Sequence, residues 1–145
     1  NSKHMTEKNI VLTLISQHRV LQKELGGVAE ELKMENPSGN KIKKLLDIFA
    51  KDLMAHLELE NNTFYKELLK KMKEKGQDTT KTEQFIGEMD EIGEKVLKFL
   101  ENYKEEAVIE KEIKEFQSNF EGIVDILVLR IESEEAGVYS YWGLF

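Results

Sequence analysis

Apolar side chains recur at alternating intervals of three and four residues along almost the whole chain. This spacing puts them on one face of an α-helix and is typical of helices that pack in bundles. The first stripe runs from about residue 6 to residue 34, and the segment 36–40 that follows holds the chain's one proline, Pro37. We predict that this segment ends the first helix. The inward positions of the first stripe are Val11, Leu14, His18, Leu21, Leu25, Val28 and Leu32.

Three more stripes follow, and Gly76 with Asp78 and Thr79 marks the end of one helix and the start of the next. The second stripe consists of Ile42, Leu46, Phe49, Leu53, His56, Glu60, Phe64, Leu68 and Met72. The third consists of Phe85, Met89, Ile92, Val96, Phe99 and Tyr103. The fourth consists of Ile113, Phe116, Phe120, Ile123, Leu127, Arg130 and Glu134.

The connection between the third and fourth stripes, around residues 104–110, contains no glycine or proline. One very long helix is therefore an alternative there. We predict a turn instead, because four stripes of similar length close a core and short connections make neighbouring helices antiparallel. The result is an all-α, up-down-up-down four-helix bundle over residues 5–137. Residues 1–4 look like an expression-tag remnant, and residues 138–145 form an aromatic C-terminal tail.

The charge and cysteine content exclude several classes of partner and site. A net charge of −7 disfavours nucleic acid and anionic membrane surfaces, and no apolar run is long enough to span a bilayer. The chain has no cysteine, which excludes disulfides and thiolate metal sites. We therefore expect a cytoplasmic protein without a nucleic-acid or membrane partner.

Five polar residues interrupt the apolar stripes at inward positions: His18, His56, Glu60, Arg130 and Glu134. A buried ion without a partner costs several kcal/mol, so such groups pair with one another or bind a metal. The two histidines stand 19 residues before and after Pro37. At a rise of ~1.5 Å per residue both lie about 28 Å from the turn, and we expect them to face each other. His56 and Glu60 share a helix face, as do Arg130 and Glu134.

The segments around these residues resemble the hemerythrin-like (HHE cation-binding) four-helix bundles. The second stripe contains H-L-E-L-E-N-N-T-F-Y from His56 to Tyr65, similar to the family's H-x-x-x-E-E-x-x-F-Y with Asn61 at the second acid. Gln17-His18-Arg19 is similar to the family's first-helix histidine segment. Glu88-Met89-Asp90-Glu91-Ile92 is similar to its E-H-x-x-I segment, with Met89 at the histidine. Arg130-Ile131-Glu132-Ser133-Glu134-Glu135 is similar to H-I-x-x-E-E, with Arg130 at the histidine.

The resemblance implies a bundle in which these positions hold two non-heme irons bridged by glutamates. The ligands that remain in this chain are His18, His56, Glu60 and Glu134. Met89 and Arg130 replace histidine ligands, and neither is suited to iron: a thioether is a poor ligand beside carboxylates, and arginine does not deprotonate. Two histidines are too few for the family's di-iron centre.

Two interpretations of the polar residues follow. In the first, the di-iron site is incomplete and holds no cofactor, the histidines are hydrogen-bonded core residues, and Arg130 stands where metal would lie, pairing with Glu60 and Glu134. The protein is then a structural, regulatory or sensory module. In the second, His18, His56, Glu60 and Glu134 hold a single divalent ion, iron or zinc, for sensing or redox chemistry. Met89 is expected to fill the core in both. The sequence contains no catalytic motif, so no enzymatic activity is expected.

The aromatic tail has two open interpretations as well. Together Tyr139, Tyr141, Trp142 and Phe145 would form an apolar patch of a kind that solitary proteins rarely expose. We expect the tail to fold back on the bundle. The alternative is a contact with a protein partner or with a second copy of the chain.

Overall fold

The computed structural model describes the backbone from residue 2 to residue 145 and the side chains from residue 10 onward. The predicted tag remnant at residues 1–4 lies outside the described side chains. The chain forms, in order, α1 (Ser2–Leu32), α2 (Gly39–Leu59), a π-helical segment (Glu60–Tyr65), α3 (Lys66–Glu74), α4 (Thr80–Asn102), α5 (Glu106–Lys111), α6 (Ile113–Ala136) and a C-terminal 3₁₀ segment (Val138–Gly143).

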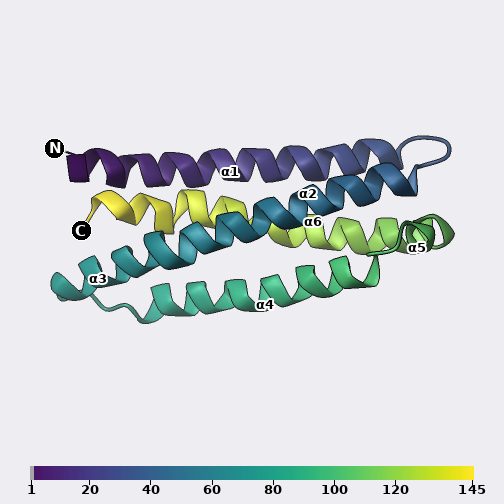
Figure 1. The fold of residues 1–145 in the computed structure, drawn as a ribbon. Coiled ribbons are helices and arrows are strands. Elements are labelled where there is room, and N and C mark those ends of the chain that lie inside the picture. Colours follow the sequence, from purple (N-terminus) through teal and green to yellow (C-terminus); the bar gives the residue numbers. More distant parts are fainter. Residues whose placement is uncertain (1) are drawn as a thin grey trace.

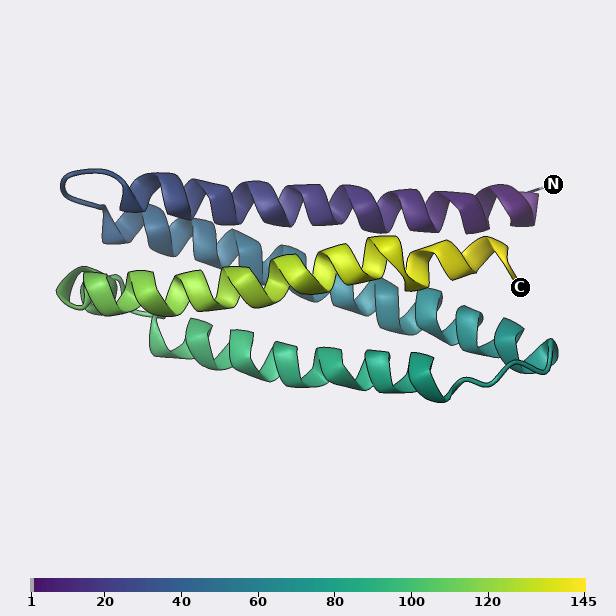
Figure 2. The same cartoon turned by 180° about the vertical axis from the view of Figure 1, so that it is seen from behind.

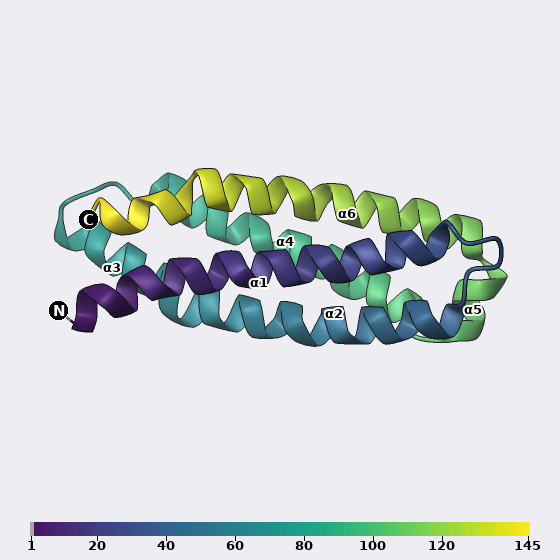
Figure 3. The same ribbon diagram turned by 90° about the horizontal axis from the view of Figure 1, so that it is seen from above.

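These elements make four long antiparallel arms, which are α1, the continuous run from α2 to α3, α4, and α6 with the 3₁₀ segment (Figures 1 and 2). The described residues contain no strand. The α1–α2 turn and α5 lie at one end of the bundle, and both chain termini lie at the other end, near α3 (Figure 3). The predicted all-α, up-down-up-down bundle is therefore confirmed. Among the described residues no helix is both long and apolar enough to cross a bilayer.

Local signals explain where the arms begin and end. Ser38 caps α2, because its hydroxyl accepts a hydrogen bond from the Lys41 amide at 3.2 Å. Gly76 follows α3 at a φ of +69°, a conformation that favours glycine. The Asp78 carboxylate accepts a hydrogen bond from the Thr80 amide at 2.9 Å at the start of α4. The predicted turn after the third arm is confirmed near Tyr103, and the short helix α5 follows it.

The apolar core consists of two clusters, one toward each end of the bundle. The larger cluster, toward the α1–α2 turn, includes Phe49, Phe99 and Phe116. The smaller cluster includes Leu14, Phe64, Leu68 and Trp142. All five polar residues singled out from the stripes are buried, with 0–4% of each side chain exposed.

The second arm contains a feature that the apolar pattern did not predict. Residues Glu60–Tyr65 form a π-helical turn, which holds more residues per turn than the α-helix. As a result the consecutive residues Phe64 and Tyr65 are both buried, and Glu60 at the start of the turn is completely buried. Single π turns inside α-helices occur frequently at functional sites.

The C-terminal tail folds back on the bundle, as expected from its aromatic content. Val138, Tyr139 and Trp142 are buried, and the Trp142 ring stacks on Phe64 with 4.9 Å between ring centroids. Leu144 is 69% exposed. A contact of this tail with a partner or a second copy stays a prediction.

The close approach of α5 to the start of α2 generates a stability test. An added Cβ at Gly39 would lie 2.7 Å from the backbone oxygen of Glu106. We expect Gly39→Ala to lower the free energy of unfolding by about 1–3 kcal/mol, because backbone must move to admit the methyl group. Gly87→Ala is the matched control, since an added Cβ there meets nothing within 4 Å. It should raise stability by up to about 1 kcal/mol. Urea unfolding measures both, and an equal effect of the two substitutions would contradict the close packing.

Candidate metal centre

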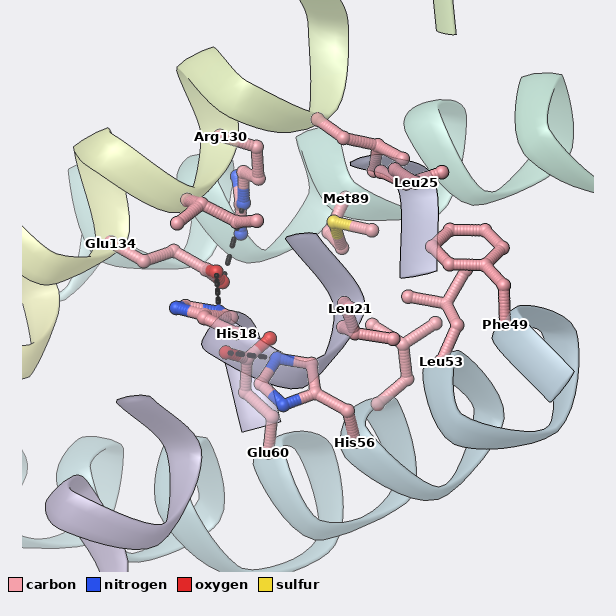
Figure 4. A pocket seen from close by; sticks show the side chains of 13 residues that line it. His18, Leu21, Leu25, Phe49, Leu53, His56, Glu60, Met89, Arg130 and Glu134 are labelled. Carbon is pink, nitrogen blue, oxygen red and sulfur yellow. Dashed lines mark hydrogen bonds and ion pairs between the residues drawn. The ribbon is translucent and has the colours of Figure 1, made fainter. Parts of the chain in front are cut away.

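Four buried side chains from three arms meet between the two apolar clusters. His18 comes from α1, His56 from the last turn of α2, Glu60 from the π-helical segment and Glu134 from α6. Each offers one ligand atom, and these four atoms lie within 4.8 Å of one another. The two imidazole centroids are 4.7 Å apart, so the histidines face each other as the sequence predicted. Figure 4 shows His18 between Glu134 and the pair of His56 and Glu60.

Hydrogen bonds on the outer side of each imidazole fix its orientation. The Nδ1 atom of His18 lies 2.7 Å from Oε2 of Glu135, and the Nδ1 atom of His56 lies 2.7 Å from Oε1 of Gln17. Both Nε2 atoms therefore point inward, 3.1 Å from Oε1 of Glu134 for His18 and 3.6 Å from Oε2 of Glu60 for His56. Metal-binding histidines in proteins use this arrangement, in which one ring nitrogen donates to an acceptor and the other faces the ion.

Two buried tyrosines complete the surroundings of the carboxylates. Tyr139, from the C-terminal 3₁₀ segment, donates its hydroxyl to Oε2 of Glu60 at 2.5 Å, and its Oη lies 3.3 Å from Nε2 of His18. Tyr65, at the end of the π-helical segment, donates to Oε2 of Glu134 at 3.1 Å. Burial, with the charges of both glutamates, raises the pKa of each hydroxyl, so both remain protonated donors when no metal is bound.

Arg130 lies beside this cluster but does not bridge its two carboxylates. Its Nε donates to Oε2 of Glu134 at 3.4 Å, and its Nη1 donates to the backbone oxygen of Phe85 at 2.7 Å. The guanidinium also lies 3.5 Å from the centroid of the Phe85 ring. The expected pair with Glu134 is therefore present, whereas the described contacts include none with Glu60. The sequence-based expectation was wrong on this point because α4 offers the guanidinium a carbonyl and an aromatic face.

Met89 fills part of the core, as expected for the residue at this position. It is 7% exposed and lines a cavity of about 20 Å³ that opens beside the four candidate ligands (Figure 4). The walls away from the polar cluster are apolar and include Leu21, Phe49 and Leu53. The acidic residues Glu88, Glu91 and Glu94 of α4 are exposed and take no part in this cluster.

The carboxylates and His18 share protons unevenly. Burial alone would raise the pKa of Glu60, but its interactions with His56 and Glu134 and the hydrogen bond from Tyr139 outweigh burial and lower the pKa. Burial raises the pKa of Glu134, and the charge of Glu60 adds to the effect. Burial would lower the pKa of His18, but hydrogen bonds to Glu134 and Glu135 outweigh it and raise the pKa above 6.5. Without metal, proton binding is therefore disfavoured at Glu60 and favoured at Glu134 and His18.

The donor set and one unsatisfied atom fit a single metal ion. Oε1 of Glu60 is buried and has no hydrogen-bond partner among the described residues. A completely buried carboxylate oxygen without a donor is unfavourable unless a cation completes its surroundings. Two imidazole nitrogens with carboxylate oxygens suit zinc or non-heme iron. The cluster could therefore hold a metal ion.

Sequence reasoning singled out the four candidate ligands but missed the residues that orient them. Gln17 and Glu135 directly adjoin His18 and Glu134 in the sequence. This adjacency is the one sequence feature that points to their role in orienting the ligands. Tyr65 ends the F-Y pair of the second-arm motif, but its inward direction depends on the π-helical turn. Tyr139 had no positional signal beyond its place in an aromatic tail.

The sequence model of the family described as the Hemerythrin HHE cation binding domain matches residues 9–142, which is nearly the whole chain. No curated protein and no solved structure matches the chain.

The contact between Arg130 and Glu134 predicts a pH-dependent mutational effect. The Arg130 charge lowers the pKa of Glu134, so it stabilises the folded protein where Glu134 is charged and loses this effect as pH falls. We expect Arg130→Met to cost about 3 kcal/mol at pH 8, as for breaking a buried ion pair, and less at pH 5. Arg19→Met is the matched control, because Arg19 is 53% exposed in its pair with Glu135. It should cost no more than about 1 kcal/mol. Equal losses in urea unfolding would show that burial of Arg130 contributes nothing.

The raised pKa values predict the pH dependence of the metal-free protein. The pKa values of His18 and Glu134 are higher in the folded state than in the unfolded state. Their contribution to the free energy of unfolding is therefore fully present below the unfolded pKa values and is lost as pH rises through the folded ones. We expect the free energy of unfolding to fall as pH rises from 5 to 8. Burial and Asp52 raise the pKa of Glu24 to about 7, which adds to the slope. Urea unfolding in the presence of a chelator should show this fall, and the Glu24→Gln variant should retain the part of the fall that is due to His18 and Glu134. A free energy of unfolding that rises between pH 5 and pH 8 would contradict the raised pKa values.

Proposed function

The chain belongs to the hemerythrin HHE cation-binding domain family, and we propose that it is a mononuclear non-heme metal-binding module of that family, with a sensory or regulatory role. The observation that carries the proposal is the convergence of four buried ligand atoms, two imidazole and two carboxylate, within 4.8 Å. The outward hydrogen bonds of both histidines support it, because they leave each Nε2 facing a carboxylate of the cluster.

The alternative of a module without metal is less well supported. In that alternative, Arg130 pairs with both carboxylates in place of a metal. The Arg130 guanidinium instead donates to Glu134 and to the Phe85 carbonyl, and among the described residues Oε1 of Glu60 has no hydrogen-bond donor. A cation near that oxygen accounts for its burial. The ion is proposed to be iron or zinc, and both suit two nitrogens and two oxygens.

The protein's own residues would prepare the site for an ion in three ways. Gln17 and Glu135 hold the imidazole rings, and Tyr139 and Tyr65 each donate to one carboxylate. The cavity beside the ligands has apolar walls and room for about one water-sized molecule. A bound ion would supply Lewis acidity there, and iron would add one-electron chemistry. The combination suits recognition of a small exogenous ligand.

Reversible oxygen carriage at a di-iron centre is not expected of this chain. Such a centre needs more histidine ligands than the two that meet here, and Met89 and Arg130 stand where the motifs place others. Arg130 also adds a positive charge beside Glu134, which disfavours a second cation.

Metal titration tests the proposed function directly. We expect the purified, chelator-treated protein to bind one zinc or ferrous ion per chain in calorimetry and elemental analysis. At about 100 times the dissociation constant, zinc should raise the free energy of unfolding by about 2.7 kcal/mol. The raised pKa of His18 means that a proton competes with the ion, so the affinity should rise between pH 6 and pH 8.

Matched carboxylate substitutions show whether the ion lies at the buried cluster. Glu60→Gln should abolish binding, whereas Glu88→Gln, at an exposed acid on α4, should leave it unchanged. Aerobic iron loading should give no oxo-bridged di-iron absorption. Absence of any bound ion would refute the proposal, and two irons per chain with that absorption would refute its mononuclear form.

A further inference from the structure

We propose that Tyr139 is a fifth ligand of this centre and binds ferric iron through its phenolate oxygen. This inference rests on the proposed metal-binding function and adds to it a protein ligand from outside the four helical motifs. It also assigns a role to the C-terminal 3₁₀ segment, which would supply part of the metal's coordination shell.

The position of the Tyr139 hydroxyl matches that of a ligand atom. Its Oη lies 2.5 Å from Oε2 of Glu60 and 3.3 Å from Nε2 of His18. Neighbouring ligand atoms of one ion lie about 3 Å apart when the bonds to the ion are about 2.1 Å long. The phenol oxygen is thus spaced from Nε2 of His18 as another ligand of the same ion would be, and it contacts the Glu60 carboxylate at Oε2, the oxygen beside the unsatisfied Oε1.

The chain holds this side chain rigidly in place. Tyr139 is 3% exposed, and its ring stacks on the His18 imidazole with 5.5 Å between centroids and 13° between planes. Gly137 makes the turn from α6, and an added Cβ there would lie 2.7 Å from the Ser133 backbone oxygen. Trp142 anchors the far end of the segment on Phe64. Tyr139 therefore faces the cluster from a fixed segment.

Charge balance explains why the phenolate would suit a ferric ion in particular. The two glutamates neutralise a divalent ion, and the Tyr139 hydroxyl can then remain a neutral donor to Glu60. A trivalent ion leaves one positive charge in a buried site, which is unfavourable without a third anion. Loss of the hydroxyl proton supplies that anion. On binding, the Oη–H bond would break and the proton would pass to the buffer, an Oη–iron bond would replace a bond from iron to water or to the nitrilotriacetate carrier, and no electron would be transferred.

Tyr65 is a natural comparison, because it is buried and close to the other carboxylate. Its hydroxyl contacts Oε2 of Glu134, whereas Oε1 of Glu134 is the atom that faces His18. Its Oη also accepts a hydrogen bond from Nη2 of Arg130 at 3.3 Å. Tyr65 is therefore assigned to the outer side of the carboxylate.

The test is the visible absorption of the protein loaded with ferric nitrilotriacetate. Phenolate bound to ferric iron gives a charge-transfer band, and we expect this band in the wild type in proportion to bound iron. Tyr139→Phe should lose the band and still bind one zinc ion, while Tyr103→Phe, at a tyrosine outside the cluster, should keep the band. Resonance Raman spectra of wild-type protein with ring-deuterated tyrosine should show shifted phenolate modes.

Further variants keep the assignment testable if Tyr139→Phe fails to fold. The chain has four tyrosines. Tyr103→Phe and Tyr141→Phe should each retain the band, and any iron that Tyr65→Phe binds should show the wild-type intensity per bound iron, which leaves Tyr139 as its source. Bound ferric iron without a band in the wild type, a band that survives Tyr139→Phe, or a lower intensity per bound iron in any of the other three would overturn the inference alone. Failure to bind either zinc or ferric iron would instead refute the proposed metal-binding function.

Discussion

Burial of two carboxylates in the middle of a helical bundle is the constraint on which the rest of this structure depends. Glu60 is completely buried and Glu134 is 2% exposed, and desolvation disfavours the charged form of both. Imidazole, phenol and guanidinium groups from α1, α2, α6, the π-helical segment and the 3₁₀ segment supply the compensating contacts. The apolar core is divided in two as a result, because this polar layer lies between its clusters.

The four helical arms and the candidate ligands could be predicted from the sequence, because both follow from the helical spacing of inward-facing residues. A polar residue on an inward position is visible in the stripe, and the equal distances of His18 and His56 from Pro37 predict their facing positions. The π-helical turn was not predictable in this way. It alters the period for a single turn, and only the burial of both Phe64 and Tyr65 reveals it.

The directions of long side chains were the second feature that the sequence did not predict. Arg130 was placed correctly on its helix face, but a long side chain reaches several partners from one position, and the Phe85 carbonyl was not visible in the pattern. Gln17 and Glu135 stand beside ligands in the sequence, but the pattern does not show that their side chains orient the imidazole rings. Periodicity thus identified residues that face the centre, while the contacts that hold them depend on tertiary packing between arms.

The contact between His18 and Tyr139 joins residues 121 positions apart. Most contacts in a helical bundle are local and form early, whereas a contact of this separation must overcome the entropy of closing a long loop. We therefore expect the cluster to close late in folding, after the arms have formed. An ion bound there would then act as a cross-link between distant parts of the chain, and its release would follow global unfolding rather than fraying of the helix ends.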